Sequence, residues 1–284
     1  MARHQSFPLN PKTLILDAKI LYVKLFLPTL ASRPLVDYIN TMPDKRTHRG
    51  PHPEDAKLFA AANIPALRQA VADYSMLLTK GYAVKSSLKL VGDHFSLTQR
   101  QRLALMRSAC SDSQLAGRRR REIGVSELCG ESIVIDGYNL LITIEAALGG
   151  AAVFLCRDGC IRDLAGIHGT YRKVNETVLA IKLIAGVLSD IGIKEALWLF
   201  DSPVSNSGRL KTMIYELIEQ NGWPWQVELF TNPDTELIRT EKTIATSDSD
   251  VLDKCRRWSN LAGHIIEQAV RSANLIDLSA LEQC

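Results

Sequence analysis

The sequence predicts an α/β fold, a Rossmann-like and mostly parallel sheet with helices on both faces, preceded by a small all-helical domain. Strand-like and helix-like patterns alternate after residue 127, which is typical of parallel strands joined by crossover helices. Residues 54–122 show helical periodicity and no strand pattern. Three of the predicted strands run directly into aspartate. We therefore expect an N-terminal extension at 1–45, a basic helical domain at 46–122 and the α/β domain at 128–284.

Charge is distributed unevenly along the 284-residue chain, although its net charge is only +3. Residues 1–41 carry +3, residues 42–122 carry +8 and residues 123–284 carry −8. A basic segment beside an acidic one suggests that the first holds a polyanion and the second collects cations. The apolar runs between residues 14 and 27 are expected to belong to an appendage.

The cysteines and the apolar segments limit the class of protein. Six cysteines form no C-x-x-C pair and no zinc-binding spacing. Cys156 and Cys160 flank an Asp158-Gly159 turn, so we expect a hairpin there rather than a metal site. No convincing signal peptide is found, which favours a reduced, cytoplasmic location. The segment 14–31 contains three charged residues and a proline, so we expect no membrane span.

In the helical domain, apolar residues recur at the spacing of a helix face. Ser96 and Gln99 fit a capping box at the start of the last predicted helix. That helix displays Arg100, Arg102 and Arg107, and a run of four arginines follows it. Helices are predicted at 54–62, 64–80, 83–91 and from 97 onward, with residues 41–53 as a loop.

In the α/β domain, β-branched and aromatic runs alternate with amphipathic segments. Strands are predicted at 133–135, 196–200, 226–230 and 243–246, with a hairpin over 153–164. Helices are predicted at 139–148, 171–191, 207–221, 234–239 and 248–258.

The acids at the strand ends are the strongest functional signal. Asp136, Asp201 and the pair Asp248 and Asp250 follow three predicted strands. Ligands of open parallel sheets bind beyond the carboxyl ends of the strands. Asp also caps helices, but capping does not explain two acids together on one strand end and acids on two others. Because Mg²⁺ and Mn²⁺ prefer oxygen ligands, the four carboxylates predict a site for one or two such ions.

Polar and basic residues near these acids are candidates for binding a phosphate-bearing substrate. The Asn that follows the first acid is expected to cap the first helix, and its amide is a candidate to contact a phosphate or a water on the metal. The arginines are also compatible with solvated turns and linkers, so both interpretations stay open. The substrate-binding candidates are Asn139, Arg157, Arg162, Arg172, Arg209, Arg118, Arg119, Arg120 and Arg121.

Three motifs, IVIDGYN at 133–139, LFDSP at 199–203 and ATSDSDVLD at 245–253, resemble those of PIN-like or NYN-type nuclease domains. The resemblance implies a Mg²⁺- or Mn²⁺-dependent phosphodiesterase acting mostly on RNA. It also implies that Asp136, Asp248 and Asp250 are the metal-binding acids, with Asp201 a weaker match. Glu176 is the candidate for the family's helix acid.

Residues 51–112 closely resemble a second family, number 434 among domains of unknown function. This match conveys no activity, so it does not bear on the choice of function.

The leading hypothesis is a metal-dependent endoribonuclease. Asp136 and Asp250 are expected to hold metal, and Asp201 or Asp248 to orient the attacking water. The alternative is a non-catalytic RNA-binding adaptor with the same fold. A haloacid-dehalogenase-type phosphohydrolase is disfavoured because Tyr138 stands where a second Asp is needed, and nucleotide-cofactor motifs are absent. RNA is the expected partner, a membrane is not, and a homo-oligomer is left open.

Overall fold

The structure is a computed structural model that describes residues 48–165 and 170–279. The chain divides between Lys45 and Arg46, and residues 46–284 form one compact unit. The appendage predicted from the apolar runs between residues 14 and 27 lies outside the described residues. Across the described part of the chain, no helix is long and apolar enough to cross a membrane.

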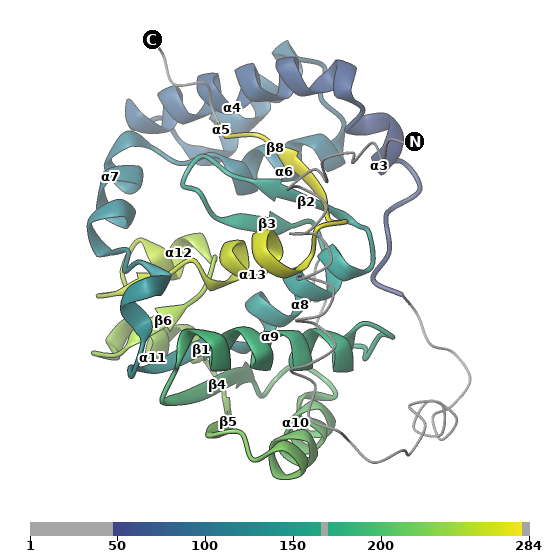
Figure 1. The fold of residues 1–284 in the computed structure, drawn as a ribbon. Coiled ribbons are helices and arrows are strands. Elements are labelled where there is room, and N and C mark those ends of the chain that lie inside the picture. The colour runs from purple at the N-terminus through teal and green to yellow at the C-terminus, as the bar shows by residue number, and fades with distance from the viewer. Residues whose placement is uncertain (1–47, 166–169, 280–284) are drawn as a thin grey trace, which may run out of the picture. The chain divides into compact units, whose positions relative to one another are not determined.

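The main sheet has five parallel strands in the order β5-β4-β1-β6-β7 (Figure 1). This arrangement confirms the predicted parallel α/β fold. From β1 the chain builds outward through β4 and β5, and it then returns to the other side of β1 to add β6 and β7. The direction therefore reverses between β1 and β6, and open parallel sheets bind their ligands at such a switch point, beyond the carboxyl ends of the strands. The strands are β1 (Ser132–Asp136), β4 (Glu195–Asp201), β5 (Trp225–Phe230), β6 (Thr243–Ala245) and β7 (Trp258–Ser259).

Helices cover both faces of this sheet. Successive residues of a strand point to opposite faces, so they pack against different sets of helices. Ile135 and Trp198 belong to the larger core, which includes residues of α8 (Gly137–Leu148), α9 (Thr177–Ile191), α10 (Ser207–Asn221) and α13 (Leu261–Ala269). Their chain neighbours Val134 and Leu199 belong to the core on the other face, which includes residues of α11 (Pro233–Arg239) and α12 (Ser249–Leu252).

A second, three-stranded sheet has the order β3-β2-β8. The predicted hairpin is confirmed, because β2 (Ala152–Leu155) and β3 (Ile161–Asp163) pair antiparallel around Gly159 at φ +82°. Parallel to β2 lies β8 (Asn274–Asp277). Val153 joins the core of the main sheet, whereas Phe154 joins the core of the helical segment. Helix α8 lies between the two sheets and is buried along most of its length (Figure 1).

The helical segment packs on the far side of the small sheet (Figure 1). The predicted helices are present, and a capping box starts α6, but it joins Thr98 and Gln101 rather than Ser96 and Gln99. Ser96 has φ 51°, so it sits in the turn before the helix. The helices are α3 (Asp55–Leu58), α4 (Ile64–Thr79), α5 (Val84–His94), α6 (Gln99–Ser108) and α7 (Asp112–Arg121), with 3₁₀ turns η1 (Ala61–Asn63) and η2 (Val125–Leu128).

Three predicted helices differ from the structure. The helix predicted at 54–62 is only the four-residue α3, followed by the 3₁₀ turn η1. Helix α9 begins at Thr177, not at residue 171, because the Tyr171 N–H donates to the Ser205 carbonyl and holds this stretch extended. The helix predicted at 248–258 is only the short α12, followed by a turn and β7. Asp248 caps that short helix, and Trp258 is fully buried on the sheet.

Candidate active site

The carboxylate of Asp136 lies at the switch point between β1 and β6. Asp136 is the last residue of β1 and the N-cap of α8, and its Oδ1 accepts a hydrogen bond from the Asn139 N–H at 3.4 Å. Its Oδ2 accepts one from the Thr246 hydroxyl at 2.7 Å. The expectation that Asn139 caps α8 is therefore wrong, because Asp136 itself takes that position. The capping bond and the threonine fix this carboxylate at the switch point.

The loop after β6 is tied to the start of α8 by a second contact. The Asn139 side-chain oxygen accepts hydrogen bonds from the Ser247 N–H at 2.7 Å and from its hydroxyl at 2.9 Å. Asp248 follows, and its Oδ1 accepts from the N–H groups of Asp250 at 2.8 Å and Val251 at 3.1 Å. Asn139 is thus a residue that positions the acidic loop, and the two strand ends form one structure.

All the strand-end acids lie on the carboxyl edge of the sheet. Asp136 and Asp201 end two adjacent parallel strands, and Asp248 caps the helix that follows the third. Asp250 lies in the first turn of α12 and is exposed. The four predicted acids are therefore on one edge, with Asp136 and Asp248 closest to the switch point along the chain.

The electrostatics of this edge point to uncompensated negative charge. Desolvation raises the pKa of Asp136 to about 7, and the charges of Asp248 and Asp234 contribute to the rise, against the bond from Thr246. Desolvation and the charge of Asp234 also raise the pKa of Asp201. A bound cation would relieve this repulsion.

Asp234 is the residue that the sequence analysis missed. Desolvation and the charges of Asp248 and Asp250 raise its pKa, and Lys254 lowers it. Asp234 also raises the pKa of Asp136 and of Asp201, so it couples to all four predicted acids. It lies in the first turn of α11, just after β5. The signal was present, since this is a fourth strand end followed closely by an acid.

The donor set matches a hard cation that keeps part of its water shell. Within residues 48–165 and 170–279, no three His, Cys, Asp or Glu side chains are grouped closely enough to hold an ion by themselves. Mg²⁺ is usually held by one or two carboxylates together with water and substrate phosphate. Asp136 and Asp248 can supply two carboxylates of that kind, so the residues fit Mg²⁺ or Mn²⁺ and not an all-protein cage.

Two of the predicted substrate-binding arginines have a different place in the structure. Arg118 and Arg162 are buried and both pair with the buried Asp158, at 2.5 Å and 2.7 Å. Burial alone would raise the pKa of Asp158, but the two guanidinium groups hold it well below its usual range. Their donors are occupied inside the protein, so this placement does not fit the expected contact with substrate phosphate.

The buried triad of Asp158, Arg118 and Arg162 also binds the loop that carries Asp248. Arg162 donates to the Ser247 carbonyl at 2.6 Å. Arg118 donates to the Ser249 carbonyl at 3.3 Å and to Asp253 at 2.7 Å. Helix α7 and the hairpin therefore hydrogen-bond to the residues on either side of Asp248.

The remaining candidates are divided between structural contacts and the surface. Arg157 bonds the Cys110 carbonyl and Asp112, both at 2.6 Å, and Arg121 bonds the Leu252 carbonyl at 2.8 Å. Four of the candidate arginines are exposed, with two at the end of α7, one before α9 and one in the first turn of α10. They are Arg119, Arg120, Arg172 and Arg209.

Glu176 does not join the aspartates. Its carboxylate accepts from the ring of His48 at 2.7 Å and from the Arg49 N–H at 3.3 Å. The neighbouring Glu145 is fully buried and is satisfied by Arg49, Tyr171 and Thr177. These contacts are structural, so the fold gives Glu176 no part in the cluster.

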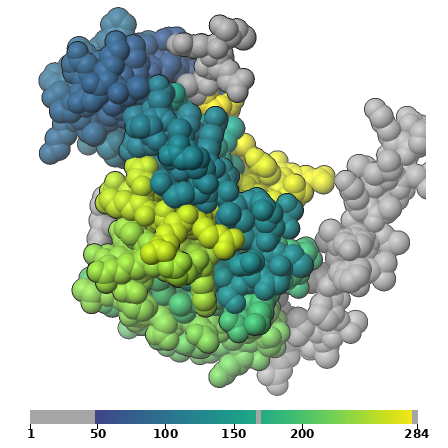
Figure 2. Space-filling model, turned by 90° about the vertical axis from the view of Figure 1, so that its left-hand side faces the viewer, coloured from purple at the N-terminus to yellow at the C-terminus, as the bar shows by residue number. Residues whose placement is uncertain are grey.

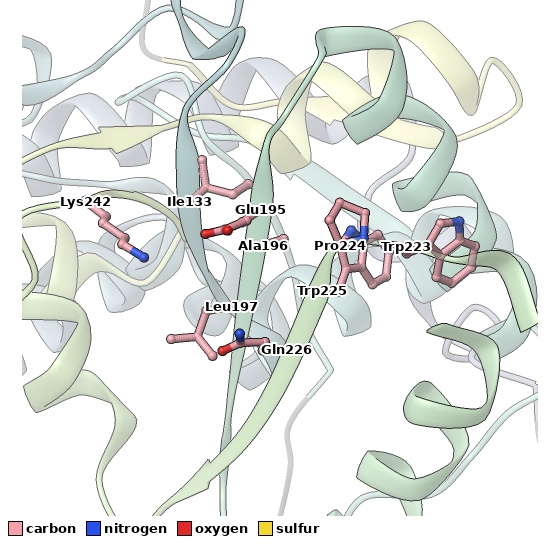
Figure 3. Close-up of a pocket in the computed structure, with 9 residues that line it drawn as sticks. All are labelled: Ile133, Glu195, Ala196, Leu197, Trp223, Pro224, Trp225, Gln226 and Lys242. Atoms are coloured by element: carbon pink, nitrogen blue, oxygen red, sulfur yellow. The ribbon is translucent and has the colours of Figure 1, made fainter. Parts of the chain in front are cut away.

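A pocket of about 300 Å³ lies at the opposite, amino edge of the main sheet (Figure 3). The first residues of β4 and β5 line it, together with Trp223 and Lys242. The acids end the strands at the other edge, so this pocket is separate from the candidate site.

Two family models match this chain, each over a different range of residues. Residues 66–121 match the family model described as a protein of unknown function (DUF434), which confirms the resemblance of that segment. Residues 125–264 match a domain of unknown function (DUF5616). The uncharacterized protein MJ0935 of Methanocaldococcus jannaschii is 32% identical over 188 residues, covering 66% of this chain and 89% of that protein. The chain belongs to the MJ0935 family. No solved structure matches it significantly.

Proposed function

We propose that this member of the MJ0935 family is a divalent-metal-dependent endoribonuclease. The observation that carries the proposal is the pairing of Asp136 with the Thr246–Asp248 loop across the β1–β6 switch point. Burial raises the pKa of Asp136, and the negative charges of Asp248 and Asp234 raise it further. The resemblance of the three strand-end motifs to PIN-like and NYN-type nucleases supports the same reaction class.

Each residue of the site has a task in this proposal. Mg²⁺ or Mn²⁺, when bound, supplies positive charge at the phosphate and promotes ionisation of water. Asp136 and Asp248 would hold the ion. Of the acids that follow β6, Asp248 is the one whose charge acts on Asp136, whereas Asp250 is exposed. Asn139 and Thr246 keep those two carboxylates in place.

Asp201 is the proposed proton acceptor. Desolvation and Asp234 raise the pKa of its carboxyl group, which favours taking up a proton. A carboxylate oxygen of Asp201 accepts the proton of the attacking water as that water adds to phosphorus. The P–O bond to the leaving oxygen then breaks, and that oxygen keeps the bonding electron pair and takes up a proton from solvent water.

The test is cleavage of a panel of labelled RNAs by wild type and Asp136→Asn, with Mg²⁺, Mn²⁺, Ca²⁺ or a chelator. The substitution keeps the size of the side chain but removes the charge, so cleavage should fall by at least ~100-fold. Asp190→Asn, an exposed acid on α9, is the matched control and should cleave as wild type does. Mg²⁺ should also raise the melting temperature of wild type more than that of Asp136→Asn.

Two results would overturn the proposal in different ways. Wild type that binds RNA but cleaves none of the panel with either metal would favour the non-catalytic adaptor. Cleavage that persists in Asp136→Asn would remove this carboxylate from the reaction.

A further inference from the structure

Exposed cations lie where α7 meets α12, the short helix that Asp248 caps. We define the basic ridge as Arg119, Arg120 and Lys254, which are all exposed. The first two come from the helical segment, and the third comes from the segment directly after α12.

The two halves of the ridge are held together by a set of hydrogen bonds. The Trp258 indole N–H donates to the Arg118 carbonyl at 2.9 Å, and the Ile123 N–H donates to the Trp258 carbonyl at 2.7 Å. Arg121 adds its bond to the Leu252 carbonyl. In Figure 2 the blue-green residues of α7 lie beside the yellow-green residues around 250–260. Because α7 is fixed on this segment, the exposed cations of both halves form one surface.

Acids neutralise only part of this charge. The charge of Arg119 acts on Glu122. Among the residues that the structure describes, Arg120 and Lys254 form no ion pair. Asp253, the acid inside this region, is already bound by Arg118 and Gln114.

The ridge adjoins α12, the helix that carries Asp250 and is capped by Asp248. Two residues of α7 hydrogen-bond to α12, Arg118 to the Ser249 carbonyl and Arg121 to the Leu252 carbonyl. Just after α12, the Lys254 N–H donates to the Val251 carbonyl, which fixes the start of the next segment. A chain of phosphates could therefore contact the ridge while one phosphate lies at the aspartates.

We propose that the basic ridge binds the backbone of an RNA strand next to the phosphate that is cleaved. The proposal rests on the proposed ribonuclease function and adds the surface that holds the substrate. The ridge is composite, since α7 falls in the DUF434 match and Lys254 falls in the DUF5616 match.

The experiment measures binding of a labelled single-stranded RNA to the full chain in chelator, across a series of salt concentrations. Each phosphate contact on a single strand contributes roughly 0.7 to the slope of log affinity against log salt. Arg119→Gln/Arg120→Gln should lower that slope by about 1.4, since two contacts are lost. Lys254→Gln, on the other half of the ridge, should lower it by about 0.7.

Lys57→Gln/Lys85→Gln is the matched control, with the same charge change on exposed residues of α3 and α5. It should leave the slope unchanged. RNA binding by wild type with the same slope in both ridge variants would overturn the ridge and leave the nuclease proposal standing. RNA bound through the ridge but not cleaved with metal would overturn the nuclease and keep the ridge. No RNA binding by wild type would overturn both.

Discussion

The Arg162 side chain donates a hydrogen bond from Nε to the backbone carbonyl of Ser247 at 2.6 Å. Ser247 directly precedes Asp248, so a buried residue of the β2–β3 hairpin sets the position of an acid at the candidate site. Asp158 holds Arg162 and Arg118 at once, and Arg118 reaches the other side of the same loop. The site is therefore supported by ion pairs that lie outside the sheet that carries it.

We expect Asp158→Asn to destabilise the protein strongly. Removing one partner of a buried ion pair leaves the remaining charges uncompensated, which costs about 3–5 kcal/mol. Here two buried guanidinium groups would lose their common carboxylate. Chemical denaturation measures the change. Asp112→Asn breaks the more exposed pair with Arg157 and should cost under about 1 kcal/mol. Equal losses in the two variants would contradict a structural role for the triad.

The stability of the metal-free protein should depend on pH through Asp136. The folded pKa is about 7 and the ordinary value is 3.8, so the folded state binds the proton more tightly. The contribution of this group to the free energy of unfolding is therefore full below pH 3.8 and is lost as the pH rises to about 7. Asp136→Asn should gain stability relative to wild type over that window. Denaturation in chelator at several pH values tests this, and a constant difference would refute the shifted pKa.

Gly137→Ala should destabilise the protein because there is no room for a methyl group. A Cβ at this position would lie 2.5 Å from the Phe200 ring and 2.7 Å from the Leu199 carbonyl oxygen. Overpacking of this kind costs about 1–3 kcal/mol. Gly208→Ala in α10 is the control, since its Cβ would meet nothing within 4 Å. Thermal unfolding compares the two, and a neutral Gly137→Ala would show that β4 can move away from α8.

Asp234→Asn should lower the pKa of both Asp136 and Asp201, since the negative charge of Asp234 raises both. NMR titration of the carboxyl carbons measures the pKa of each group directly. Glu236→Gln, an exposed acid on the same helix, should leave both values unchanged. Unshifted titrations in Asp234→Asn would separate this residue from the cluster.

The strand ends were predictable because local pattern alone determines them. The run Ile133–Ile135 has to be a buried strand, and the acid after it has to lie at the sheet edge. Asp234 was not recognised as a site residue because a short turn separates it from the end of β5. The two-residue strand β7 has too few residues to show a periodic pattern.

The roles of the arginines were not predictable from the sequence. Nothing local distinguishes Arg118 from Arg119, yet one is buried and the other is exposed. The difference depends on Asp158, which is 40 residues from Arg118 and meets it only in the folded chain. Interpretation of an arginine run therefore needs the tertiary structure.

The pairing of β2 with β8 has a consequence for how the chain is made. β2 forms early in the α/β part, but its parallel partner is the last described strand, and Phe154 shares its core with Ile276 and Leu278. During synthesis on the ribosome, one side of β2 stays without a partner until the chain beyond residue 270 has emerged. An unpaired strand edge beside an open apolar face invites association with other chains. The nascent protein should therefore be vulnerable to aggregation, or reliant on a chaperone, until β8 has emerged.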